Sequence, residues 1–276
     1  MTKRFAFKRY AAVGVLGASL LAGCAAVNTT SGGAVGVERK QYMSSLVSET
    51  ELNQTAAQQY AQMMSQARSQ GALDVDVAQT QRVRAISQRL VKQVGAFRPD
   101  AVNWDWEVHV LRSDDVNAWC MPGGKMAVYT GLIQKTNATD DELAAVMGHE
   151  IAHALREHSR EQVSQQMATS LGLSVLSAVI GNAAVGDLGS SLTDVMFNLP
   201  NSRTHEIEAD RIGVELAARA GYDPRAAISL WQKMAQLSGS GGTPEILSTH
   251  PSPQSRIAEL EVAAEQVMPL YQAARK

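Results

Sequence analysis

The sequence predicts a predominantly helical α+β fold with a small antiparallel sheet. Apolar residues recur at helical spacing in several long segments, whereas the alternation typical of strands is confined to residues 104–129. A short leader precedes these segments, and the roughly 250 residues after it are enough for one substantial hydrophobic core. We therefore expect a single domain over residues 38–276.

The first 23 residues have the composition of a signal peptide. Four basic residues within the first nine precede an apolar run from Ala11 to Leu21, and small residues follow it. A run of about 11 residues is too short to span a bilayer, which needs about 20. We therefore predict a cleaved leader over residues 1–23 rather than an uncleaved anchor helix.

The leader ends in Leu21-Ala22-Gly23-Cys24, which resembles a bacterial lipobox. The resemblance implies cleavage before Cys24, lipidation of that cysteine and attachment to a membrane of the bacterial cell envelope. Ala25 stands where lipoproteins retained in the inner membrane carry aspartate. The resemblance therefore implies sorting to the outer membrane, with the protein facing the periplasm.

Without the leader the chain is acidic and has one free thiol. The leader holds 4 of the 25 basic residues and no acidic ones, which leaves 21 basic against 27 acidic residues, a net charge of about −6. This composition gives no reason to expect a nucleic-acid partner. With Cys24 lipidated, Cys120 cannot form an intrachain disulfide, and we expect it to be a small buried residue.

The segments before residue 130 are predicted to be a tether, two helices and the sheet. Residues 24–37 are small, polar and glycine-containing, which predicts a flexible tether reaching at most about 45 Å from the membrane. Helices are predicted from Glu38 to about Gln70 and from about Val75 to Val94. The strands are expected at the end of this region, over residues 104–110, 117–121 and 125–129, with a Pro-Gly-Gly turn between the last two.

The motif His149-Glu150-Ile151-Ala152-His153 carries the strongest chemical signal. Thr139 and the acidic residues after it predict a helix start, and apolar residues follow at helical spacing. Residues four apart lie on one face of a helix, so both imidazoles can reach one metal ion while the glutamate stands beside it as general base. This arrangement is typical of zinc hydrolases; the alternative is a chance match on an ordinary core helix.

A second helix, predicted over residues 203–220, offers the third ligand. Its four candidates are His205, Glu206, Glu208 and Asp210. Glu206 and Asp210 share a face, so one can bind the metal while the other holds a histidine ring by a hydrogen bond. Glu208 lies about 200° around the helix from Glu206 and is expected to face solvent, and His205 is expected to point away from the metal.

Three further segments complete the chain. Residues 161–199 are rich in Ala, Ser, Gly and Leu, and we expect a mobile helical lid or a packed hairpin there rather than a membrane helix, because polar residues interrupt the run. Helices are also predicted from Pro224 to Leu237 and from Gln254 to Met268, with a Gly/Ser loop over 238–243.

Two other histidines are not expected to bind the metal. His158 follows His149 by nine positions, about 180° around a continuous helix, and is therefore expected at the surface. His109 lies in a predicted strand and is expected to be structural.

Two more sequence motifs accompany the two helices that carry the candidate metal ligands. Val116 to Lys125 is followed by Tyr129-Thr130-Gly131-Leu132, and Thr249-His250-Pro251 is followed by Arg256. With the two helices, they resemble the gluzincin peptidases related to HtpX, Oma-type and CAAX prenyl proteases over residues 75–265. The lipobox makes the chain similar to BepA-like and LoiP-like periplasmic members, without tetratricopeptide repeats. The resemblance implies a zincin-like catalytic domain.

The resemblance also implies a role for each matched residue. The residues His149, His153 and Glu206 would bind one zinc ion per chain, Glu150 would be the catalytic base, and Asp210 and Arg256 would support the ligands. His250 has two possible catalytic roles: it stabilises the transition state, or it fills the open coordination position and keeps the enzyme latent. A loop histidine fixed by Pro251 is the third possibility.

These roles predict a membrane-anchored zinc metalloendopeptidase. Zinc would acidify a bound water, Glu150 would take its proton, and the strand residues Asn117, Ala118, Trp119 and Cys120 would align an extended substrate by backbone hydrogen bonds. Because such pairing is nearly blind to sequence, the expected substrates are unfolded or misfolded envelope polypeptides, with the outer-membrane assembly machinery as a further partner. The alternative function is a chaperone or adaptor lipoprotein with a regulatory or latent zinc site.

Overall fold

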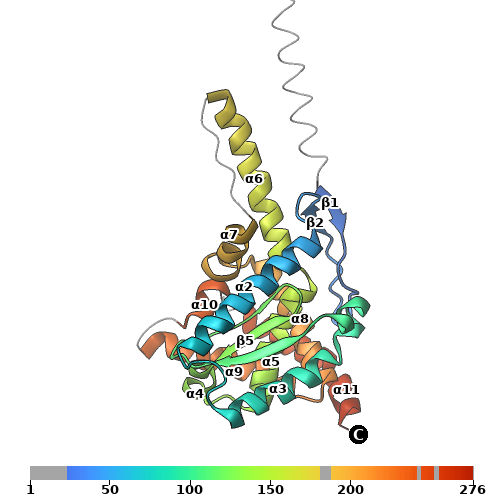
Figure 1. The fold of residues 1–276 in the computed structure, drawn as a ribbon. Coiled ribbons are helices and arrows are strands. Elements are labelled where there is room, and N and C mark those ends of the chain that lie inside the picture. Colours follow the sequence, from blue (N-terminus) through green and yellow to red (C-terminus); the bar gives the residue numbers. More distant parts are fainter. Residues whose placement is uncertain (1–23, 181–187, 241–243, 252–254, 276) are drawn as a thin grey trace, which may run out of the picture.

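The computed structural model describes residues 24–180, 188–240, 244–251 and 255–275, in which helices surround a small sheet (Figure 1). The elements up to residue 135 are β1 (Cys24–Val27), β2 (Gln41–Ser44), α2 (Glu49–Ser69), α3 (Val77–Val91), η1 (Val94–Ala96), η2 (Pro99–Asn103), β3 (Glu107–Leu111), β4 (Ala118–Met121), β5 (Lys125–Tyr129) and α4 (Thr130–Lys135). The later elements are α5 (Asp140–Leu155), α6 (His158–Ile180), α7 (Leu188–Thr193), the π-helical turn η3 (Asp194–Asn198), α8 (Arg203–Arg219), α9 (Ala226–Ser240), α10 (Ile246–Thr249) and α11 (Ser255–Ala274). The predicted leader lies outside the described residues.

The central sheet has the strand order β3-β5-β4. The antiparallel pair β4 and β5 was expected from the Pro-Gly-Gly turn, and Gly123 and Gly124 have the positive φ angles, 78° and 86°, that favour glycine. The prediction of a wholly antiparallel sheet is wrong, because β3 pairs with β5 in parallel. This crossover leaves β4 at one edge of the sheet.

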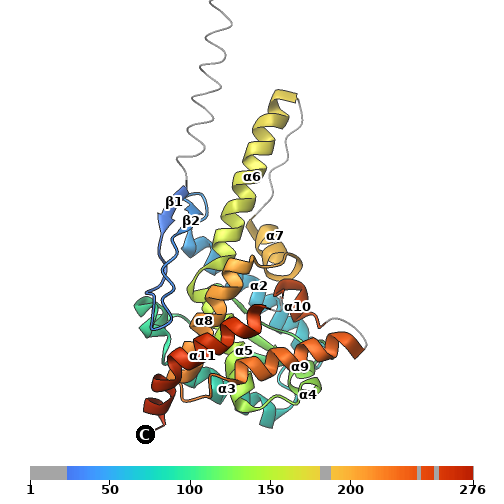
Figure 2. The same ribbon diagram turned by 180° about the vertical axis from the view of Figure 1, so that it is seen from behind.

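The sheet lies between two layers of helices. On one face α2 crosses the strands, and the hydroxyl of Tyr60 on α2 donates a hydrogen bond of 2.9 Å to the carbonyl oxygen of Met126 on β5. Helix α5 packs against β4, and the view from behind shows α9 and α11 on the side away from α2 (Figure 2). Helix α5 is therefore buried along most of its length, including His149 and His153.

The crossing of α5 and α8 brings their backbones into contact through two glycines. A Cβ atom on Gly148 would lie 2.8 Å from the carbonyl oxygen of Gly213, and one on Gly213 would lie 2.6 Å from the backbone nitrogen of His149. No larger side chain fits there without moving a backbone. The contact fixes the start of the His149 motif against the helix that carries Glu206.

The start of α5 follows from its sequence. Thr139 accepts a hydrogen bond from the backbone N–H of Glu142, whose side chain in turn accepts one from the N–H of Thr139. This reciprocal pair satisfies two N–H groups that the first helical turn leaves without partners. The predicted helix start is confirmed, as is the predicted end of α8 before Gly221, where φ is 78°.

The N-terminal segment differs from both predictions made for it. Residues 24–37 do not hang free: β1 pairs with β2, Val35 and Val37 are buried in the main core, and the backbone N–H of Val35 donates to Glu215 at 3.0 Å. The helix predicted from Glu38 begins only at Glu49, because β2 occupies residues 41–44. This segment is therefore part of the folded domain.

The alanine- and serine-rich region forms α6, which projects from the body, and α7, which returns beside its base (Figures 1 and 2). Residues 181–187 between the two helices lie outside the described residues, so the predicted mobile lid stays a prediction. Among the described parts of the chain, no helix combines the length and the apolar character needed to cross a membrane.

Candidate metal centre

Four buried side chains converge where α5, α8 and the end of α10 meet. His149 and His153 come from α5, Glu206 from the first turn of α8, and His250 from the C-terminal end of α10. One ligand atom from each lies within 4.8 Å of the other three. The structure thus brings together all three predicted zinc ligands and the predicted fourth residue, from segments up to about 100 positions apart in the chain.

The atoms that face one another in this cluster are imidazole nitrogens and carboxylate oxygens, which are ligand types that zinc binds. Nε2 of His149 lies 3.0 Å from Nε2 of His153 and 3.6 Å from Oε2 of Glu206. Oε1 of Glu150 is buried and accepts no hydrogen bond. A buried carboxylate oxygen without a donor is costly, so a bound cation fits the site that this atom faces.

The imidazole of His149 is held from behind by Asp210 and Arg256. Nδ1 of His149 lies 2.9 Å from Oδ1 of Asp210, and Arg256 donates to both oxygens of Asp210 at 2.6 and 2.7 Å. A carboxylate can only accept, so His149 carries its proton on Nδ1 and presents the lone pair of Nε2 to the cluster. Arg256 also stacks on the ring of Trp231, with 3.4 Å between its Cζ atom and the ring centroid.

Arg256 also approaches the proposed carboxylate ligand. Nη1 of Arg256 lies 2.8 Å from Oε2 of Glu206, an ion-pair distance, although the two groups are not aligned as a hydrogen bond. Burial would raise the pKa of Glu206, but the charge of His250 and the close approach of His250 and His153 hold it well below its ordinary value. Burial holds the pKa of His153 well below its ordinary value. The pair is thus an ionised carboxylate and a neutral imidazole, the forms that bind metal.

Glu150 and His250 face each other across the cluster. Oε1 of Glu150 lies 3.5 Å from Nε2 of His250. Burial raises the pKa of Glu150, although the charges of His250 and His149 lower it in part. Burial lowers the pKa of His250, but the carboxylates of Glu150 and Glu206 outweigh it and raise the pKa to about 9. A carboxylate with a raised pKa is suited to taking up and passing on a proton.

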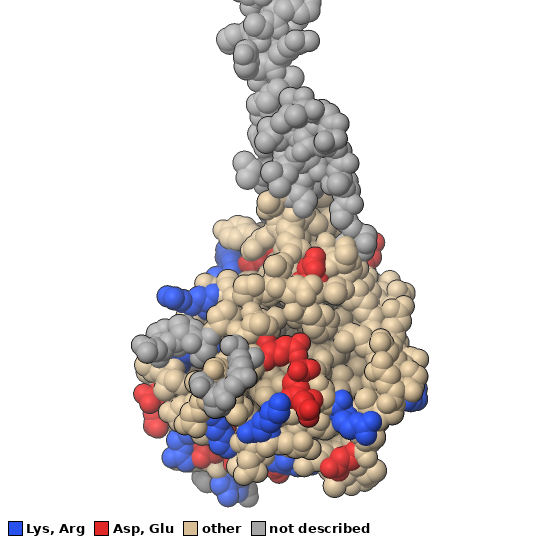
Figure 3. Space-filling model, turned by 90° about the vertical axis from the view of Figure 1, so that its left-hand side faces the viewer, with Lys and Arg blue, Asp and Glu red and all other residues tan. Residues whose placement is uncertain are grey.

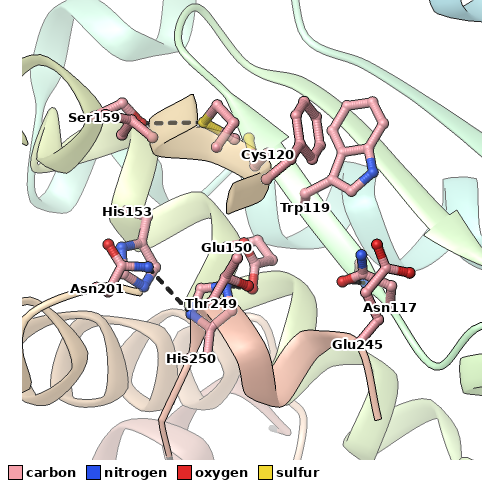
Figure 4. Close-up of a pocket in the computed structure, with 14 residues that line it drawn as sticks. Asn117, Trp119, Cys120, Glu150, His153, Ser159, Asn201, Glu245, Thr249 and His250 are labelled. Carbon is pink, nitrogen blue, oxygen red and sulfur yellow. Dashed lines mark hydrogen bonds and ion pairs between the residues drawn. The ribbon is translucent and has the colours of Figure 1, made fainter. Parts of the chain in front are cut away.

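A pocket leads from the surface to this cluster (Figure 4). Its lining comes from β4 and the residue before it, α5, η3 and the chain around α10: Asn117, Ala118, Trp119, Cys120, Glu150, His153, Ser159, Val195, Met196, Phe197, Asn201, Glu245, Thr249 and His250. Figure 3 shows this side of the molecule, with mostly uncharged residues around a central hollow and acidic side chains below it. The four predicted substrate-binding residues therefore line the route to the predicted metal ligands.

Strand β4 lies along this pocket, and its four residues are buried. Within the described ranges no strand pairs with β4 other than β5. Phe197 of η3 lies over Trp119 in an edge-to-face contact with 5.6 Å between ring centroids. Cys120 is buried, as predicted, and burial raises the pKa of its thiol well above the ordinary value, which suits a structural residue and not a nucleophile.

Two predictions of solvent exposure, for His158 and Glu208, are wrong. His158 is fully buried, because α5 ends at Leu155 and the chain turns at Glu157, where φ is 51°. The turn brings Nδ1 of His158 to 2.9 Å from Nδ1 of His153. Glu208 is buried rather than facing solvent, because the N-terminal end of α8 is buried on the side of Glu208 as well as on the side of Glu206.

The surroundings of Glu208 form a polar network that the sequence did not predict. Arg156 and Arg39 donate to its carboxylate at 3.0 and 2.6 Å, and Nε2 of His158 lies 3.1 Å from it. His205 stacks on the ring of His158 at 4.3 Å between centroids and points away from the metal ligands, as predicted. The only sequence signal for this network was the density of charged residues in the two helices.

The comparisons with known proteins agree with this geometry. The model of peptidase family M48 matches residues 77–264. The chain is 39% identical over 166 residues to the mitochondrial metalloendopeptidase OMA1 of Arabidopsis thaliana, covering 59% of this chain and 33% of that protein. It is 39% identical over 191 residues to the OMA1 metalloendopeptidase of Bos taurus, covering 65% of this chain and 36% of the relative.

A third relative is bacterial. The chain is 28% identical over 214 residues to the beta-barrel assembly-enhancing protease of Escherichia coli, covering 74% of this chain and 43% of that protein. The chain therefore spans about a third to under half of the length of these relatives. The family model covers both helices of the metal cluster, β4 and the His250 segment. On this match the chain belongs to peptidase family M48.

Proposed function

We propose that the protein is a zinc-dependent endopeptidase. The observation that carries the proposal is the convergence of His149, His153 and Glu206, with Glu150 beside them, at the inner end of a pocket lined by an edge strand. This is a donor set for one zinc ion with a carboxylate placed for proton transfer. The relatives named as metalloendopeptidases support it.

Each side chain has a defined part in this proposal. His149, His153 and Glu206 would hold the zinc ion, and Asp210 and Arg256 keep the His149 ring in place. When bound, zinc polarises the scissile carbonyl and acidifies water. Glu150 would take a proton from the attacking water and pass it to the departing amine, which requires a carboxylate that can hold a proton briefly.

The substrate is proposed to be an extended stretch of polypeptide. The backbone groups of β4 at residues Ala118 to Met121 lie at a sheet edge, where an added strand can pair with them. Backbone pairing reads no side-chain identity, so any chain that is locally unfolded can enter. This favours unfolded or misassembled proteins as substrates.

The place of action is proposed from the N-terminus. Lipidation of Cys24 would attach the domain to a membrane of the cell envelope, most simply the outer membrane facing the periplasm. Because residues 24–37 are folded against the body, the domain would lie close to the membrane surface. Envelope protein quality control is the corresponding role, and the relative named as a beta-barrel assembly-enhancing protease favours outer-membrane assembly intermediates among the substrates.

One observation favours a second function. His250 reaches into the ligand cluster, with Nδ1 3.0 Å from Oε1 of Glu206. In its neutral form, which a bound cation would favour over the charged form, this histidine can occupy the coordination position that an attacking water needs. A chaperone or adaptor with a latent zinc site is therefore the alternative.

The test is cleavage of an unfolded protein such as casein by the purified chain, with and without a zinc chelator. The proposal expects cleavage within the casein chain that stops with the chelator and returns when zinc is added. Zinc binding without any cleavage would support the latent alternative. Cleavage that is insensitive to the chelator would contradict both.

A further inference from the structure

The ring of His153 is engaged on both nitrogens. Its Nε2 atom faces the cluster, 3.0 Å from Nε2 of His149 and 3.4 Å from Oε1 of Glu206. Its Nδ1 atom lies 2.9 Å from Nδ1 of His158. Two imidazole nitrogens at this distance form a hydrogen bond only if one of them carries a hydrogen.

The next contact decides which nitrogen carries it. Nε2 of His158 lies 3.1 Å from Oε2 of Glu208, and a carboxylate only accepts, so the hydrogen of a neutral His158 is on Nε2. Nδ1 of His158 is then an acceptor. His153 must therefore donate from its own Nδ1, which leaves the lone pair of its Nε2 for the metal.

Glu208 is itself held by groups that cannot move freely. The guanidinium of Arg156 is completely buried and donates to Oε2 of Glu208 at 3.0 Å. Arg39 donates to Oε1 at 2.6 Å. His205 stacks on His158 with 11° between the ring planes, which limits rotation of the His158 ring.

Part of this support comes from the N-terminal segment. Arg39 also donates to both oxygens of Glu161, at 2.8 Å each, and Gln41 on β2 donates to Oε2 of Glu161 at 3.0 Å. Arg156 donates to the backbone oxygen of Arg39 at 2.9 Å. Residues on both sides of the chain turn after α5 are thus tied to residues 39–41.

We propose that His158 and Glu208 are positioning residues of the metal site, which fix the tautomer and the ring orientation of His153, and that Arg39 holds this pair in place. They support His153 as Asp210 and Arg256 support His149, so both histidine ligands have a carboxylate behind them. The inference rests on the proposed zinc site. Partners of this kind change metal affinity by about 10- to 100-fold when removed.

The first experiment compares zinc affinity, measured by competition with a chelator, in three variants. His158→Phe removes the acceptor for His153 and should weaken zinc binding by about 10- to 100-fold. His158→Asn keeps an acceptor oxygen near the position of Nδ1 and should retain more affinity than His158→Phe. His109→Phe is the control, because it removes a largely buried histidine of β3 that pairs with Asp74 and does not belong to the metal cluster, and it should bind zinc like the unmodified chain.

The outcomes separate this inference from the proposed function. Failure of the unmodified chain to bind zinc would contradict the proposed function itself. Normal zinc binding by the unmodified chain and equal affinity in His158→Phe would overturn only the positioning role. Equal losses in His158→Phe and His109→Phe would also overturn it, because general destabilisation of the fold would then explain the effect.

A second experiment needs no substitution and therefore does not depend on the variants folding. In zinc-loaded protein with 15N-labelled histidine, nuclear magnetic resonance should show a hydrogen on Nδ1 of His153 and a coupling through the hydrogen bond to Nδ1 of His158. The same spectrum should place the hydrogen of His158 on Nε2. A His153 ring with its hydrogen on Nε2, or no coupling between the two rings, would overturn the inference.

Discussion

Nδ1 of His250 lies 3.0 Å from Oε1 of Glu206, and it lies 3.3 Å from Nε2 of His149. The imidazole thus stands among the proposed zinc ligands rather than beside them. Its Nε2 atom is 3.5 Å from Oε1 of Glu150, the proposed base. In this arrangement His250 occupies the space between the ligands and the group that would activate water.

The position of His250 predicts that its removal increases activity. In His250→Ala the ligand cluster keeps three donors and gains room for water, so we expect turnover of casein to rise roughly 2- to 10-fold at matched zinc occupancy. A much slower variant would instead assign His250 to transition-state stabilisation. An unchanged rate would leave it as an ordinary loop histidine.

The third ligand can be tested by metal content. We expect about one zinc ion per purified chain, and Glu206→Ala and His153→Ala should each lose most of it, because each removes one of three donors. Elemental analysis after dialysis is the measurement, and a variant at the solvent-exposed Glu261 is a suitable control. Full zinc content in Glu206→Ala would move the third ligand elsewhere.

The lipid anchor can be tested at Cys24. The motif Leu21-Ala22-Gly23-Cys24 predicts that Cys24→Ala abolishes incorporation of labelled fatty acid and leaves the protein unprocessed or released from the membrane. Cys120→Ala is the matched control, since that thiol is buried. Processing and membrane attachment like those of the unmodified chain in Cys24→Ala would refute lipidation.

Acid should weaken the fold through the network around Glu208. Burial lowers the pKa of His158 to about 3, so below about pH 6.5 an unfolded chain binds a proton that the folded chain excludes. Burial raises the pKa of Glu208, but hydrogen bonds from His158 and Arg39 outweigh it and lower the pKa to about 2. Stability that depends on this ionised carboxylate is present above about pH 4.5 and is lost as the pH falls towards 2.

His158 and Glu208 therefore both lower the stability of the fold as the pH falls. The free energy of unfolding should fall as the pH drops from about 6.5, by at most about 1.4 kcal/mol per pH unit for His158. Urea unfolding with a chelator present throughout measures this without a contribution from zinc release. His158→Asn should flatten the slope between about pH 6.5 and 4.5, and an unchanged slope in that variant would contradict the assignment.

Sequence predicted best what local signals encode. The Thr139 and Glu142 pair starts α5, Gly221 ends α8, and the Pro-Gly-Gly turn joins β4 to β5; each is a short-range hydrogen-bond or backbone requirement. The predicted ligands also came together, because spacing of four on one helix and a matching acidic pattern on another restrict the geometry strongly.

Sequence failed where distant segments decide the outcome. The chain turns at Glu157 with a positive φ although no glycine marks the place, so helical periodicity alone predicts a continuous helix with His158 exposed. Helical geometry predicts an exposed Glu208, because nothing in the local sequence indicates that Arg39 and Arg156 contact its carboxylate. The parallel pairing of β3 with β5 depends likewise on a crossover that no turn motif encodes.

The central claim is that Glu150 transfers the proton in a zinc-dependent cleavage. The most direct measurement is casein turnover by Glu150→Gln at the same zinc content as the unmodified chain. Gln keeps the size of the side chain but cannot take up the proton, so the account predicts retained zinc and fold with turnover reduced by about 100- to 10,000-fold. Turnover close to that of the unmodified chain, at equal zinc content, would contradict it.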